Sequence, residues 1–312
     1  MKISNQTNNQ KNFCGHLGYE YIKGFGMKNG VSTETCFFRD FDTIDFATKY
    51  LKNTFKDVKE KSIIIGACST GEDAYSIKML MGNTPARITA FDLGRKTVQK
   101  AQKGYFGIFQ PDGDYMLIHP QIKYTDALKD IFILQPDRNL EKKEQVLKKL
   151  FLDKFEKENK SDNLLDEIHS FIKRILKQDK KEQEQDIFKL KDTVEKCDFI
   201  QGDIRDINSF LPDKKVQLFS FKNAFYHLVT DNNYCTRQEL PKSRIKPMLD
   251  NIFRDINKKL DMNGLFIMGE KEHEQTSNVN IITKSLLDNG YIPIRLKEQP
   301  YPNVWKKVKE NN

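Results

Sequence analysis

The sequence has no apolar run long enough to cross a bilayer, and its first residues, MKISNQTNNQKNF, lack the apolar core of a signal peptide. We therefore expect a soluble protein that is cytoplasmic or exported without a cleaved signal. The five cysteines are scattered and form no CxxC pair, which argues for reduced thiols and against a disulfide framework. The histidines show no i, i+4 pairing, so no metal site is predicted.

The charge pattern disfavours nucleic acid as a partner. The formal net charge is +8, but lysine and glutamate alternate through the most charged region. No basic stripe with interleaved aromatic residues results, as a nucleic-acid footprint would need. The charge remains compatible with an acidic protein partner, and twenty-two Phe and eleven Tyr supply ample core material.

Residues 125–195 differ in composition from the rest of the chain, because they contain almost no Gly or Pro. Apolar stripes of helical spacing occur there, at Leu147, Leu150, Phe151 and Phe155 and again at Leu164, Ile168, Phe171, Ile172 and Ile175. These stripes predict two or three charged amphipathic helices inserted into a domain formed by residues 33–124 and 196–312. The insertion presents either a solvated face or a surface for a partner, and residues 1–32 form an N-terminal extension with a hairpin turn at Asn29-Gly30.

The most informative stretch runs from residue 61 to residue 92. An apolar run ends at Gly66, small residues lead to Gly71, and a helical pattern follows with Glu72 and Asp73 in its first turn. A second strand then ends at Asp92, where a nucleotide-binding βαβ unit places the carboxylate for a ribose. The pattern favours a nucleoside cofactor over a turn that needs glycine only for packing, and by itself leaves a nicotinamide cofactor open.

Further segments repeat the alternation of helix and strand. Helices are predicted over 41–57, from residue 93 to a cap at Gly104, over a stripe from Leu249 to Leu260 with Pro247 in its first turn, and up to Gly290. Strands are predicted in CDFIQGDIRD, VQLFSF and GLFIMG, with two more after Gly290. The sum is an α/β fold with a doubly wound, mostly parallel sheet and an antiparallel C-terminal hairpin.

The turn from Gly66 to Gly71, which we call the glycine turn, has a specific sequence. GACSTGEDAYS closely resembles the ACSTGEEPYS signature of the chemotaxis-receptor methyltransferases, the CheR family, which use S-adenosylmethionine. Four more segments resemble that family in the same order: TETCFFRD, FDLGRKTVQKAQKGYFG, SFKNAFYHL and INKKLDMNGLFIMGEKE. The resemblance implies a class I methyltransferase fold, S-adenosylmethionine as cofactor and a carboxylate, such as a protein glutamate, as methyl acceptor.

The resemblance also implies a set of cofactor-binding residues. They are Thr33, Thr35, Arg39, Gly66, Ala67, Ser69, Gly71, Glu72, Asp73, Asp92, Asp203, Ile204, Lys222 and Asn223. Asp203 and Ile204 stand where the family has Asn-Leu beside adenine, and Lys222 stands for an arginine, without its planar fork.

Catalytic roles are implied for Arg39, which would orient the acceptor carboxylate, and for Tyr226 or His227, between which the register leaves the family's tyrosine open. Only about thirty residues precede Thr33, so we expect the family's helical N-terminal domain to be missing. Three hypotheses remain: a protein carboxyl methyltransferase, a methyltransferase for another acceptor, and a non-catalytic interaction protein that keeps the fold.

Overall fold

The computed structural model describes residues 37–109, 138–157, 185–211, 213–230, 239–269, 272, 276–296 and 301–311. The predicted hairpin at Asn29-Gly30, the site residues Thr33 and Thr35, and the apolar stripe from Leu164 to Ile175 lie outside these ranges.

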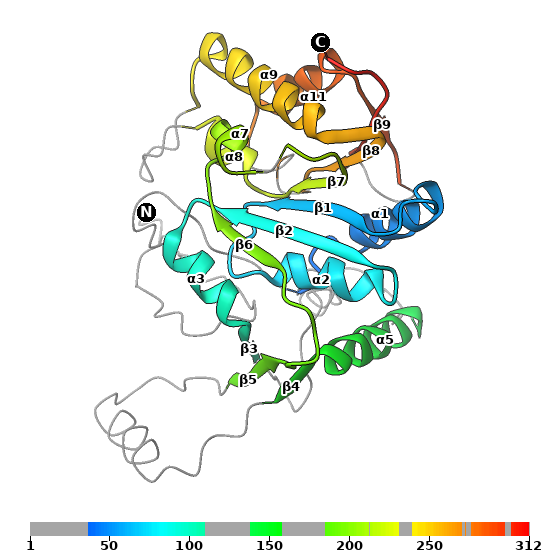
Figure 1. Cartoon of the computed structure of the whole chain (residues 1–312). Helices are drawn as coiled ribbons and strands as arrows, with labels where there is room; N and C mark the ends of the chain where they lie inside the picture. Colours follow the sequence, from blue (N-terminus) through cyan, green and yellow to red (C-terminus); the bar gives the residue numbers. More distant parts are fainter. Residues whose placement is uncertain are drawn as a thin grey trace, which may run out of the picture.

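The main sheet has seven strands among the described residues (Figure 1). Its order is β6 (Asp198–Gln201), β2 (Ala86–Asp92), β1 (Lys61–Gly66), β7 (Val216–Phe221), β8 (Leu260–Ile267), β10 (Val304–Lys307) and β9 (Tyr291–Ile294). The first five strands are parallel, and β10 runs antiparallel to both β8 and β9. The predicted mostly parallel sheet with an antiparallel C-terminal hairpin is confirmed.

Helices cover both faces of this sheet (Figure 1). One face carries α1 (Phe41–Thr54), α2 (Glu72–Met81) and α3 (Arg95–Lys103), and the other carries the short α7 (Ile207–Phe210) and α8 (Phe225–Leu228) with the longer α9 (Lys242–Lys259) and α11 (Val279–Asp288). A 3-10 turn, Ile204–Asp206, leads into α7. Two apolar cores result, one on each side of the sheet.

Most local predictions hold. Helix α1 buries the predicted stripe at Ile44, Ala47 and Leu51, and Gly104 caps α3 with a φ of 72°. Pro247 is a correction, because α9 already begins at Lys242 and the proline lies inside it. A proline has no backbone N–H, so one hydrogen bond of the helix is missing at this position. The loss is tolerated because the helix is exposed around the proline, and the carbonyl that is left without a donor can bond water.

The predicted helical insertion also needs correction. Helix α5 (Arg138–Lys154) is present, but Phe155–Lys157 (β4) and Gln185–Leu190 (β5) are strands. Strand β5 pairs antiparallel with β3 (Tyr105–Phe109) and with β4 to form a second, three-stranded sheet. Cross-strand pairing over a long sequence separation overrides local helix propensity here.

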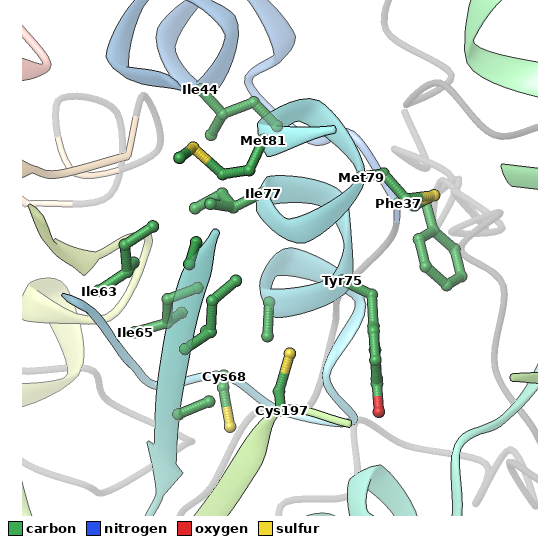
Figure 2. Packing of buried hydrophobic residues seen from close by; sticks show 14 of the residues in the cluster. Phe37, Ile44, Ile63, Ile65, Cys68, Tyr75, Ile77, Met79, Met81 and Cys197 are labelled. Atoms are coloured by element: carbon green, nitrogen blue, oxygen red, sulfur yellow. The ribbon is translucent and has the colours of Figure 1, made fainter. Parts of the chain in front are cut away.

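Aromatic side chains join this second sheet to the main core. Phe151 and Phe155 have their ring centroids 5.0 Å and 5.5 Å from that of Phe37, and Tyr75 of α2 lies 5.7 Å from Phe155. Figure 2 shows Phe37 and Tyr75 on the side of α2 that faces away from Ile63 and Ile65 of β1. Helix α2 is thus buried on two sides, and the residues of the insertion that pack on it are core.

None of the helices in the described ranges combines the length and the hydropathy that crossing a membrane would require.

Candidate active site

The turn between β1 and α2 lies at the carboxyl edge of the parallel strands. Gly71 has a φ of 102°, a conformation that favours glycine, and Ala67 and Ser69 adopt φ values of 51° and 49°. Gly66 has a different reason to be glycine: a Cβ there would lie 2.5 Å from the ring of Phe91 and 2.6 Å from that of Phe221. Packing explains Gly66, and backbone conformation explains Gly71.

Asp92 at the end of β2 is tied to this turn. Its Oδ2 accepts a hydrogen bond from the Ser69 backbone N–H at 2.9 Å, and its Oδ1 accepts one from Gly94 N–H at 2.8 Å. Burial raises the pKa of Asp92, and these two bonds oppose that shift. A carboxylate offers about four acceptor positions, so the two backbone bonds leave capacity for the two hydroxyls of a ribose.

A buried ionic network adjoins the turn. The Arg39 Nη2 donates to Asp73 Oδ2 at 2.9 Å, and the Lys222 Nζ lies 3.2 Å from Asp73 Oδ1. Lys222 also donates to the Arg39 carbonyl at 2.8 Å and lies 3.5 Å from Asp40 Oδ2. We call these four charged side chains, of Arg39, Asp40, Asp73 and Lys222, the Arg39–Lys222 network. The network joins three segments: the start of α1, the start of α2 and the end of β7.

The network fixes the charge of Asp73. Burial alone would raise the pKa of this carboxyl, but the Lys222 and Arg39 cations outweigh burial and lower it. Next to it, the Thr70 hydroxyl donates to Glu72 at 2.7 Å and 2.8 Å, and the Ser76 hydroxyl accepts from the Phe38 N–H at 2.8 Å. The predicted residues Glu72 and Asp73 are therefore buried and already engaged by the protein.

Backbone strain gathers at the same edge. Among the described residues, six non-glycine residues have positive φ: Phe38, Asp40, Ala67, Ser69, Asn223 and Asn263. All but Asn263 belong to the glycine turn or to segments that the Arg39–Lys222 network joins. Left-handed conformations of such residues cost free energy and cluster at functional sites, so this edge is the strongest candidate site on physical grounds.

Tyr226 and His227 lie on α8, just beyond β7. Both are partly exposed, and their ring centroids are 4.1 Å apart. The structure brings both residues to the same edge as Arg39.

Sequence reasoning missed two carboxylates here. Asp40 accepts from the Asn223 Nδ2 at 3.4 Å, and Glu272 is fully buried against the start of α8. The signal for Glu272 was available, since it closes the last matched segment, shortly after the buried strand GLFIMG.

The two residues predicted to contact adenine follow β6. Asp203 follows β6, but its carboxylate is held by Arg205, with Nε 3.0 Å from both oxygens. Ile204 is buried in the core beneath α9. An adenine contact through Asp203 would have to share this carboxylate with Arg205, so it stays a prediction.

The described residues include no cluster of His, Cys, Asp and Glu that could hold a metal ion.

Glu272 predicts a pH dependence of stability. Burial raises the pKa of Glu272 from 4.5 to about 7, against the backbone N–H groups and Arg39, which lower it. Between these values the folded protein keeps a proton that the unfolded chain has lost, so the free energy of unfolding falls as pH rises from 4.5 to 7. The expected fall is on the order of 3 kcal/mol.

Urea unfolding at a series of pH values measures this fall, and Glu272→Gln should flatten it. Equal slopes in the wild type and in Glu272→Gln would assign the pH dependence to other groups.

The comparisons with known proteins bear on this edge directly. Residues 33–110 match the family model for the CheR methyltransferase, SAM binding domain. The resemblance to the CheR family is confirmed over these residues. They contain the glycine turn, Asp92, Arg39 and Asp73, so the cofactor of this CheR-like domain is S-adenosylmethionine. A search of curated proteins found no match.

Solved structures with a similar arrangement include other methyltransferases. An rRNA methylase from Streptococcus thermophilus is 8% identical, with 89% of this chain and 100% of that chain covered and a TM-score of 0.36. TrmN from Thermus thermophilus is 11% identical over 85% of this chain and 49% of its own, with a TM-score of 0.35. CurJ carbon methyltransferase is 9% identical over 85% and 54%, with a TM-score of 0.41.

The chain spans about half the length of the last two proteins. Since all three TM-scores lie below 0.5, these similarities assign no substrate. The class I methyltransferase fold of the CheR-like chain rests on its own sheet order, with β10 reversed between β8 and β9.

Proposed function

We propose that this CheR-like methyltransferase transfers a methyl group to a carboxylate of a protein, forming a glutamyl methyl ester. The observation that carries the proposal is the position of Arg39, whose guanidinium is bound to Asp73 in the first turn after the glycine turn. An arginine beside the cofactor turn suits a carboxylate acceptor, which it can bind through parallel hydrogen bonds.

The residues of the turn fit the cofactor. The backbone from Ala67 to Gly71 would hold its amino-acid part, and Asp92 would accept hydrogen bonds from its ribose. Asp203 and Ile204 stand at the end of β6, the side expected for adenine. Lys222 and Asn223 hold Arg39 and Asp40, which makes them positioning residues in this proposal.

Bound S-adenosylmethionine supplies a methyl group activated by its sulfonium charge. The chain needs no general base for the reaction, because a carboxylate is already ionised at neutral pH. Its own task is alignment: Arg39 orients the acceptor, and Tyr226 or His227 lines the position beside it. The strained backbone of Phe38 and Asp40 fixes Arg39 between them.

Replacing Asp92 by alanine tests the cofactor site. The variant should lose on the order of 2 to 4 kcal/mol of binding free energy for S-adenosylhomocysteine, because two charge-assisted hydrogen bonds disappear. Isothermal titration measures this loss. Asp198→Ala is the matched control, since Asp198 is an exposed carboxylate at the first residue of β6, away from the edge of the sheet that carries Asp92.

Unchanged affinity in Asp92→Ala would remove this carboxylate from the cofactor site. Stabilisation by NADH and not by S-adenosylhomocysteine would overturn the methyltransferase assignment. With labelled cofactor, a base-labile label on protein supports the ester, whereas a base-stable label points to another acceptor atom. Cofactor binding without any transfer would favour the non-catalytic interaction protein.

A further inference from the structure

Glu272 has no role in the function proposed above, although it stands beside the candidate site. It is fully buried and follows β8, the strand next to β7 in the sheet. A buried carboxylate is costly unless hydrogen-bond donors surround it, so the donors show what this residue holds.

Three backbone N–H groups of one short segment donate to the Glu272 carboxylate. Glu272 Oε1 accepts from Ala224 at 2.5 Å and from Phe225 at 2.9 Å, and Oε2 accepts from Tyr226 at 2.9 Å. These groups lie at the start of α8, in the connection that leads from Lys222 to Tyr226 and His227. One side chain therefore satisfies three consecutive N–H groups of the β7–α8 connection.

A second contact holds the same connection from the same side. A Cβ on Gly269 would lie 2.1 Å from the Asn223 Oδ1 and 2.7 Å from its backbone nitrogen. The chain after β8 thus packs directly on Asn223, which has a left-handed φ of 55°. The β7–α8 connection is thus held at two neighbouring points. Gly269 packs closely against it, and Glu272 accepts its hydrogen bonds.

We propose that Glu272 is a positioning residue that fixes the β7–α8 connection and thereby sets where Tyr226 and His227 stand relative to Arg39. The consequence for the acceptor rests on the proposed function. The anchoring of the backbone does not, because it involves only groups of this chain.

Several charged or titratable groups meet at this connection. Arg39 acts on Glu272 through its positive charge, and Lys222, Asp40 and Asp73 belong to the network that holds Arg39. Tyr226 and His227 are carried by the connection itself. Protonation of Glu272 weakens the three N–H bonds, but it also removes the larger cost of burying a charge, and for this reason the pKa of Glu272 is raised.

Amide hydrogen exchange by NMR on the full chain tests the anchoring. In Glu272→Gln the amides of Ala224, Phe225 and Tyr226 should exchange at least about tenfold faster than in the wild type. In the wild type their exchange, corrected for the intrinsic rate, should become faster as pH rises from 4.5 to about 7, because opening exposes a carboxyl whose pKa is higher in the closed state. This pH dependence should be absent from Glu272→Gln. Glu239→Gln is the matched control, because Glu239 accepts a backbone N–H from Ser277 at 2.7 Å.

Unchanged exchange of the three amides in folded Glu272→Gln would overturn the proposal. If that variant does not fold, the wild type alone decides: a midpoint shared by the three amide resonances in a pH titration supports the anchoring, and its absence overturns it. Titration with S-adenosylhomocysteine separates the two claims. Failure of the wild type to bind it would overturn the proposed function and leave the exchange result standing.

Discussion

Replacing Lys222 by methionine is expected to lower the free energy of unfolding by about 3 to 5 kcal/mol. The Lys222 side chain is 1% exposed and lies 3.2 Å from Asp73 Oδ1 and 3.5 Å from Asp40 Oδ2. Methionine fills the same space without the charge, so Asp73 would keep its bond to Arg39 but lose the Lys222 cation, and Asp40 would lose its contact with Lys222. The Arg39 carbonyl would also lose its donor. Urea unfolding measures the loss of stability.

Two further variants make this test specific. Lys215→Met removes a lysine before β7 that is 49% exposed and pairs with Glu310 at 3.4 Å, and it should change stability by less than about 1 kcal/mol. Lys222→Arg keeps the charge and restores the residue of the family pattern, so it should lose less than Lys222→Met. A loss in Lys222→Met no larger than in Lys215→Met would show that the buried network does not hold these segments together.

Replacing Phe151 by alanine should cost about 3 to 5 kcal/mol of stability. Phe151 belongs to the insertion, yet it is 0% exposed, and its ring lies 5.0 Å from Phe37, 4.6 Å from Phe155 and 5.1 Å from Phe188. The cavity would open next to Phe37, two residues before Arg39. We therefore expect affinity for S-adenosylhomocysteine to fall along with stability.

The neighbouring residue supplies the control. Leu152 on the same helix is 44% exposed, so Leu152→Ala should change stability by less than about 1 kcal/mol. Thermal unfolding and isothermal titration on both variants complete the test. Equal, small effects of the two substitutions would make the insertion an appendage with no share in the core.

The sequence predicts those elements whose signals are local. Val216–Phe221 is a strand with the predicted bounds, because it is a mostly apolar run in which only Gln217 and Ser220 are polar, and all six of its residues are buried. Helix α3 ends at its predicted cap because a φ of 72° at Gly104 suits glycine. In both cases the deciding information lies within a few residues.

The second sheet could not be predicted in this way. Gly107 of β3 pairs with Ile187 of β5 across a long stretch of chain, and neither strand shows a clean alternation. The segment around Phe155 even has helical spacing, since Phe151 and Phe155 are four residues apart. What makes Phe155 a strand residue is its position against Phe37, Tyr75 and Phe106, which belong to other elements.

In the candidate site, too, some residues could be predicted from local sequence and others could not. The glycine turn and Asp92 follow from one continuous stretch of sequence, and the structure ties them together through the Ser69 N–H. Lysine is usually a surface residue, so nothing local reveals that Lys222 is buried against a segment 183 residues earlier. Glu272 closes the last segment that resembles the CheR family, but its charged neighbours in GEKEHE do not indicate that it is buried.

The position of β10 has a consequence for synthesis of the protein on the ribosome. Strand β9 is made first, but among the described strands it pairs only with β10, which inserts between β9 and β8. Until Val304–Lys307 emerge, the nascent chain therefore has an unpaired edge at β8 and a β9 without a neighbour. The cofactor half of the sheet can assemble well before that moment, so vectorial folding completes the CheR-like part first and closes the opposite edge late.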